Sequence, residues 1–191
     1  DVEILVLPAT RMTFQEIFDY ANETTGPGDI HILCNTDIAI IRGFDTLEQA
    51  LSPDDFLCVS RYEGNGIIND HAYGSQDVWV WRGHNRIRGA NFHLGIRGCD
   101  CHLIGMARRF HYQVTNPSKD LISVHCHESN LRNAKYNERI IPGPWFGVEP
   151  SALGVLGEVC QFKSTDNCPV IRPSGGMSRS ALRMACAKAF G

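Results

Sequence analysis

The sequence lacks several features that would place it in a common class of protein. No run approaches the roughly 18–20 apolar residues of a membrane-spanning helix, so no membrane span is expected. A net charge of -3 supplies no broad positive field, which argues against nucleic acid as a partner. Glycine and proline follow no repeat and 43% of the residues are hydrophobic, which excludes collagen-like and disordered chains. These absences indicate a soluble globular domain.

The signature motifs of common nucleotide-binding and hydrolase folds are also missing. The chain has no P-loop, no Gly-x-Gly-x-x-Gly and no Gly-x-Ser-x-Gly elbow. A classical nucleotide fold and a triad hydrolase are therefore not indicated. The chain opens with Asp1 and not Met, so we expect a mature form or a piece of a longer protein.

Cysteine and histidine are present at 8 residues each. Cysteine makes up about 4% of the chain, below the 8–10% typical of a disulfide scaffold. Cys34 and Cys58 lie inside apolar runs, as buried thiols do. We therefore expect most cysteines to be reduced core residues, which leaves the cellular compartment open.

Apolar runs alternate with helical patterns along the chain. Short strands are expected at residues 2–7, 29–34, 38–41, 56–60, 77–81, 112–115 and 121–125. Thr13 followed by Glu16 forms a capping box that predicts a helix, and further helices are expected over 46–51 and 103–110. This order predicts an α/β fold with a mixed, mainly parallel sheet flanked by helices. Residues 1–140 are expected to form the core, and the Gly/Pro-rich residues 141–191 an irregular extension packed on the same domain.

Asp37 is the first candidate metal ligand. It follows an apolar strand in the segment Asn35-Thr36-Asp37, and ligands of parallel α/β sheets bind at the carboxyl ends of strands. A carboxylate there suits a hard divalent cation shared with a diphosphate. The alternative is an ordinary turn, in which Asn and Asp are common.

Asp100 is the candidate general base. It lies just before the helix expected from Leu103, where the exposed backbone N–H groups stabilise an anion. Facing a cleft, such a carboxylate accepts a proton from a hydroxyl acceptor. The alternative is an N-cap residue without a chemical role.

His125 and His127 alternate across Cys126, so a strand places both on one face. Paired imidazoles favour a metal or phosphate role. Alternatively, they join Cys99 and Cys101 as a tetrahedral Zn²⁺ set, although this spacing is not that of a standard zinc finger. The third possibility is that these are plain core or surface residues.

Ser75, Gln76 and Asp77 precede the strand that contains Trp79. Their polar groups can hydrogen-bond a sugar, and the indole can stack on it. The alternative places the tryptophan in the core.

Several short motifs follow one another along the chain between residues 9 and 133. They are Asn35-Thr36-Asp37, Arg61-Tyr62-Glu63, Ser75-Gln76-Asp77-Val78-Trp79, Leu94-Gly95-Ile96-Arg97-Gly98-Cys99-Asp100, Asn116-Pro117-Ser118 and His125-Cys126-His127-Glu128-Ser129. Together they resemble a family of glycosyltransferase-like proteins with a GT-A-like fold, found in bacteria, large viruses and eukaryotes.

The resemblance implies transfer of a sugar from a nucleotide-sugar donor to a hydroxyl acceptor, with Mn²⁺ or Mg²⁺ bridging the diphosphate. It implies that Asp37, with His125 or His127, ligates the metal and that Asp100 is the base. Asn35, Ser75, Gln76, Asp77 and Trp79 would then bind the substrate.

The sequence departs from that family at its start, where about one βα unit is missing. Cys101 also stands where the family has Asn. Two alternatives therefore remain open: a catalytically inactive GT-A-like subunit of a larger assembly, and a zinc-stabilised binding module.

Overall fold

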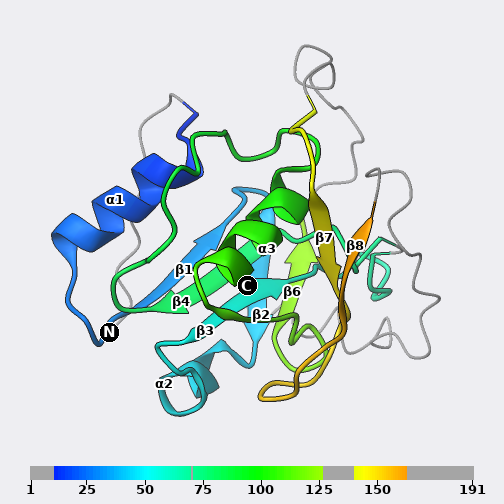
Figure 1. Ribbon diagram of the computed structural model, residues 1–191. Helices are drawn as coiled ribbons and strands as arrows, with labels where there is room; N and C mark the ends of the chain where they lie inside the picture. The colour runs from blue at the N-terminus through cyan, green and yellow to red at the C-terminus, as the bar shows by residue number, and fades with distance from the viewer. Residues whose placement is uncertain (1–10, 70, 127–139, 163–191) are drawn as a thin grey trace.

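A computed structural model of the protein describes residues 11–69, 71–126 and 140–162. Its main sheet has four strands in the spatial order β1-β4-β3-β5 (Figure 1). They are β1 (Ile30–Cys34), β4 (Val78–Arg82), β3 (Asp55–Val59) and β5 (Gln113–Thr115). Their β-branched and aromatic residues favour the extended backbone. Together with the helices they confirm a mixed α/β class.

The main sheet is mixed as expected, with β1, β3 and β5 pointing one way and β4 the other, but fewer of its pairings are parallel than expected. β4 runs antiparallel to both β1 and β3, and only β3 and β5 pair in parallel. The error arose at β4, because an apolar run shows that a strand is present but carries no information on its direction. The strand expected at residues 2–7 lies outside the described residues.

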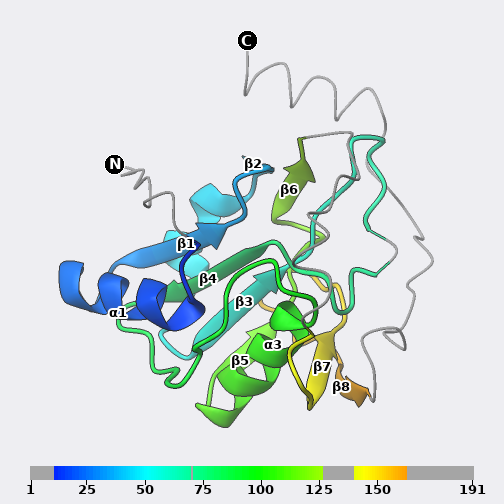
Figure 2. The same ribbon diagram turned by 90° about the horizontal axis from the view of Figure 1, so that it is seen from above.

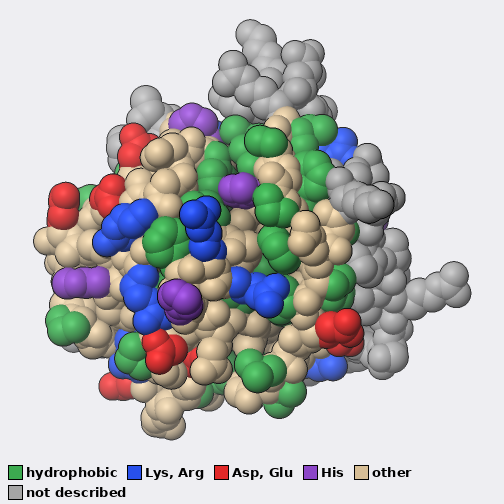
Figure 3. Space-filling model, viewed as in Figure 1, with side chains coloured by type: hydrophobic (Ala, Val, Ile, Leu, Met, Phe, Trp, Pro, Cys, Tyr) green, Lys and Arg blue, Asp and Glu red, His purple; other side chains and the backbone are tan. Residues whose placement is uncertain are grey.

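Helices α1 (Phe14–Thr24) and α3 (Cys99–Arg109) cover one face of this sheet (Figures 1 and 2). Alternate residues of β4 explain both cores: Trp79 and Trp81 face the helices, while Val78 and Val80 join the cluster on the other face. Lys and Arg side chains lie near the middle of the helical face with acidic side chains around them (Figure 3).

Local sequence signals define the ends of these helices. The Thr13 hydroxyl accepts from the backbone N–H of Glu16 and the Glu16 carboxylate accepts from that of Thr13, which confirms the capping box. α3 begins at Cys99, four residues before the expected start, after Gly98 with φ of 84°. Glycine adopts this left-handed conformation without strain, so the chain turns into the helix there. Asp100 therefore lies in the first turn of α3.

Two small sheets complete the described fold. β2 (Ile38–Arg42) pairs antiparallel with β6 (Ile122–His125), and η1 (Phe44–Thr46) and α2 (Leu47–Ala50) follow β2. The strands expected at 38–41 and 121–125 and the helix over 46–51 are therefore confirmed.

The Gly/Pro-rich region is more regular than expected. β7 (Trp145–Val148) and β8 (Val159–Phe162) form an antiparallel hairpin against α3. Its packing explains Gly147, because a Cβ there would collide with the ring of Tyr73. Residues 163–191 lie outside the part of the chain that the structure describes. In the described part, no helix is both long and apolar enough to cross a membrane.

Candidate functional site

Two loops meet at one end of the main sheet: the loop after β1 and the loop that joins β3 to β4. The antiparallel register pairs Cys34 with Val78, so the next residues outward, Asn35 and Asp77, are neighbours. The Asn35 amide Nδ2 donates to Asp77 Oδ1 at 2.7 Å. Register pairing of Val59 with Val78 brings the loop after β3 to the same place.

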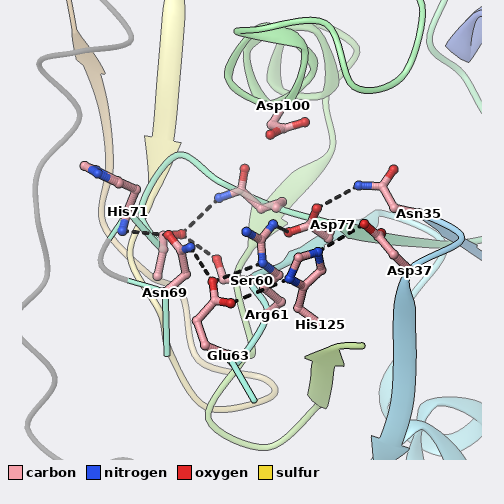
Figure 4. A network of polar contacts seen from close by, with 12 residues as sticks. Asn35, Asp37, Ser60, Arg61, Glu63, Asn69, His71, Asp77, Asp100 and His125 are labelled. Carbon is pink, nitrogen blue, oxygen red and sulfur yellow. Dashed lines mark hydrogen bonds and ion pairs between the residues drawn. The ribbon is translucent and has the colours of Figure 1, made fainter. Parts of the chain in front are cut away.

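That loop supplies Arg61, the cation at the centre of the site (Figure 4). Its Nη1 donates to Asp77 Oδ2 at 2.7 Å, and its Nε donates to Glu63 Oε1 at 3.2 Å. Asn69 also donates to Glu63 Oε1, at 2.8 Å. Burial raises the pKa of Glu63, but the hydrogen bond from Asn69 and the charge of Arg61 outweigh it and lower the pKa. Glu63 is therefore an anion at neutral pH.

The small β2–β6 sheet adds Asp37 and His125. Ile38 pairs with His125 across the two strands, which places the residue before β2 beside the end of β6. His125 Nε2 lies 3.0 Å from Asp37 Oδ2, and His125 Nδ1 lies 3.7 Å from Glu63 Oε2. The imidazole thus connects Asp37 to the network around Arg61 (Figure 4).

Asp100 faces this network from the first turn of α3 (Figure 4). Its Oδ1 accepts from the Cys99 thiol at 3.0 Å, and its carboxylate accepts from the backbone N–H of Gln76. Burial and, next, the charge of Asp77 raise the pKa of Asp100 to about 7, against the opposing effects of Cys99, Arg61 and the Gln76 N–H. At neutral pH this carboxyl therefore exchanges its proton readily.

Five residues singled out in the sequence belong to this one arrangement. They are Asn35, Asp37, Asp77, Asp100 and His125. Ser75 is half-buried in the same loop as Asp77. His127 lies outside the described residues.

The side chains of Gln76 and Trp79 are buried and do not line a surface that a sugar could contact. The Gln76 side chain is fully buried and donates to the carbonyls of Ala72 and Tyr73. Trp79 is also fully buried, with its ring edge-to-face against Phe14 at 5.0 Å between centroids. The assignment of Trp79 as a stacking residue is therefore corrected: the inward face of β4 points into the core.

Sequence reasoning passed over Arg61, Glu63 and Asn69 as site residues. Arg61 and Glu63 follow directly after a buried strand, and this same signal had singled out Asp37. Asn69 carried no such signal, because the loop between β3 and β4 brings it back to Glu63.

Asp37 and His125 together offer one oxygen ligand and one nitrogen ligand to a metal ion. Within residues 11–69, 71–126 and 140–162, no group of three or more His, Cys, Asp or Glu side chains gathers as a metal site. Mg²⁺ and similar hard ions take one or two protein ligands and complete their shell with water and substrate phosphates. The Asp37 carboxylate suits such a partial shell, whereas the His125 imidazole, 3.0 Å away, is a nitrogen ligand that hard ions take less readily.

The zinc set does not assemble in the described part of the chain. The Cys101 thiol donates to the carbonyl of Gly74, and the Cys99 thiol donates to Asp100. Burial raises the pKa of Cys99, which disfavours the thiolate that zinc binds. Cys99, Cys101 and His125 form no common group.

Comparisons with known proteins return no match: no family model, no curated protein and no solved structure matches the chain.

Proposed function

We propose that this protein is a GT-A-like glycosyltransferase that moves a sugar from a nucleotide-sugar donor to a hydroxyl acceptor, with Mn²⁺ or Mg²⁺. One observation carries the proposal. Residues of five ordered sequence motifs, spread from Asn35 to His125, meet in a single polar network at one end of the sheet. Strand register brings these loops together, and the residues that they place there are the polar ones that the resemblance assigns to the site.

Asp37 and His125 would hold the divalent cation. Their side chains are 35% and 15% exposed, so both reach solvent and a ligand arriving from it. When bound, the cation stabilises the negative charge of the leaving nucleoside diphosphate. Among the described residues of the network, the acids Asp37, Glu63 and Asp77 outnumber Arg61, and this excess of acid favours a cation.

Asp100 would act as the general base. The acceptor hydroxyl oxygen forms a bond to the anomeric carbon, and its proton passes to a carboxylate oxygen of Asp100. The bond from the anomeric carbon to the diphosphate oxygen breaks, and the nucleoside diphosphate leaves with the electron pair. A base works best when its pKa is near the working pH, and the value of about 7 for Asp100 meets this condition.

The experiment is calorimetric titration of the full chain with Mn²⁺ and a panel of UDP- and GDP-sugars. We expect a sugar nucleotide to bind only with Mn²⁺, and Asp37→Ala to weaken this binding at least tenfold. Asp45→Ala is the matched control, because Asp45 is an exposed acid of η1 outside the network. Failure of every sugar nucleotide to bind, with or without metal, would refute the proposal and favour a non-catalytic subunit.

A further inference from the structure

Both carboxylate oxygens of Asp77 already accept hydrogen bonds within the protein, so the side chain is poorly suited to bind a sugar. Its Oδ1 accepts from Asn35 and its Oδ2 accepts from Arg61, both at 2.7 Å. The side chain is 9% exposed. Both partners are donors, so their contacts suit the ionised carboxylate. Asp77 is thus a fixed negative charge below the surface of the site.

The groups around Asp100 show where this charge acts. Arg61 and Asp77 lie at the two ends of the loop that joins β3 to β4, and Asp100 points toward both from α3 (Figure 4). Two thiols also face it, Cys99 on α3 and Cys58 on β3. Burial raises the pKa of both thiols, so they stay neutral and contribute no charge.

We propose that Asp77 is a positioning residue that sets the protonation state of Asp100, and that Asn35 and Arg61 serve to hold Asp77 in place for this purpose. The role rests on the proposed function, in which Asp100 is the base. Asp77 therefore leaves the set of sugar-binding residues and acts on the reaction through Asp100.

The reasoning is electrostatic. A second negative charge on Asp100 is unfavourable beside Asp77, whereas the guanidinium of Arg61 favours it. Burial is the largest cause that raises the pKa of Asp100, and the charge of Asp77 adds to it against Arg61, so that Asp100 can take up a proton at neutral pH. Without Asp77, Arg61 would act unopposed, and Asp100 would remain ionised down to lower pH and be a weaker base.

The test measures the pKa of Asp100 by carboxyl ¹³C NMR in protein labelled at aspartate, with Asp100→Asn identifying the resonance. No nucleotide or metal is added, so the result does not depend on whether sugar transfer occurs. We expect the pKa of Asp100 to fall by about one unit in Asp77→Asn and to rise in Arg61→Gln. Glu63→Gln is the matched control, because Glu63 also pairs with Arg61 but is not among the groups acting on Asp100.

The pKa of Asp100 is expected to change in opposite directions in Asp77→Asn and Arg61→Gln. This difference distinguishes an electrostatic effect from a general loosening of the site. Loosening admits water and lowers the pKa of Asp100 in both variants, whereas the proposed role lowers it in Asp77→Asn alone. A fall in Asp77→Asn that exceeds that in Glu63→Gln and is absent from Arg61→Gln supports the proposal. A fall in Asp77→Asn and Arg61→Gln alike, or no greater fall in Asp77→Asn than in Glu63→Gln, overturns it. If Asp77→Asn does not fold, Asp77→Ser takes its place, with the same expected fall in the pKa of Asp100 and the same outcome that overturns the proposal.

Discussion

His125 Nε2 lies 3.0 Å from Asp37 Oδ2, although 88 positions of sequence separate the two residues. The β2–β6 ladder brings them together, because Ile38 and His125 are register partners. Any variant that shifts this ladder by one residue would turn the imidazole away from Asp37, since successive side chains of a strand point to opposite faces.

This pair predicts the effect of removing the imidazole. In the proposed site His125 is a nitrogen ligand, so His125→Ala should weaken Mn²⁺ binding about tenfold or more. Electron paramagnetic resonance of free Mn²⁺ measures the affinity. His111→Ala is the control, because His111 is exposed in the turn after α3. Equal affinities in both variants would contradict the assignment of His125 as a ligand.

Asp100 predicts a dependence of stability on pH. Its pKa is about 7 in the folded protein and about 4 in the unfolded chain, so the folded state binds more protons between these values. The free energy of unfolding should therefore decrease as pH rises from 4 to 7 and level off above 7. We expect a loss on the order of 2 kcal/mol, since partial exposure of the side chain reduces the effect.

Urea denaturation of the wild type and of Asp100→Asn at pH 5 and pH 8 measures this loss. Asparagine does not titrate, so the variant should lose less stability over this interval than the wild type does. The same pH dependence in both proteins would show that another group is responsible.

Asn116 has no role in the proposed reaction, but its removal should strongly lower the stability of the fold. Its side chain is fully buried, with Oδ1 accepting from the Ser60 N–H at 3.1 Å and Nδ2 donating to the Ala72 and Val148 carbonyls. Asn116→Ala leaves the Ser60 N–H without this acceptor and removes one donor from the Val148 carbonyl, while the Ala72 carbonyl still accepts from Ser60 and Gln76. It should destabilise the fold by about 2–4 kcal/mol. Chemical denaturation measures the change.

The control for this variant is Asn91→Ala, because Asn91 is exposed. Its effect should stay within about 0.5 kcal/mol. A loss of less than about 1 kcal/mol for Asn116→Ala would show that water replaces the amide.

Local patterns predicted most of the elements correctly. The capping box at Thr13, the apolar runs of β1, β3 and β4, and the short helix after η1 all depend on neighbours within a few residues. The direction of β4 and the β7–β8 hairpin were missed, because both depend on contacts between distant segments. The hairpin, for example, depends on a close approach of Gly147 to Tyr73.

The candidate site shows the same division. The sequence pointed to Asp37 and Asp100 because carboxylates after strands and at helix starts have recognisable local settings. It missed Asn69, and it placed Trp79 at a ligand, since burial on the inward face of a strand depends on what packs there.

By itself the sequence determined which segments become strands and helices and which polar residues stand at their ends, because these properties arise from local backbone preference and apolar periodicity. The tertiary structure alone decided that Asn35, Arg61, Asp77 and Asp100 share one electrostatic environment. Charges act on one another through space, and only strand register and loop paths set those distances.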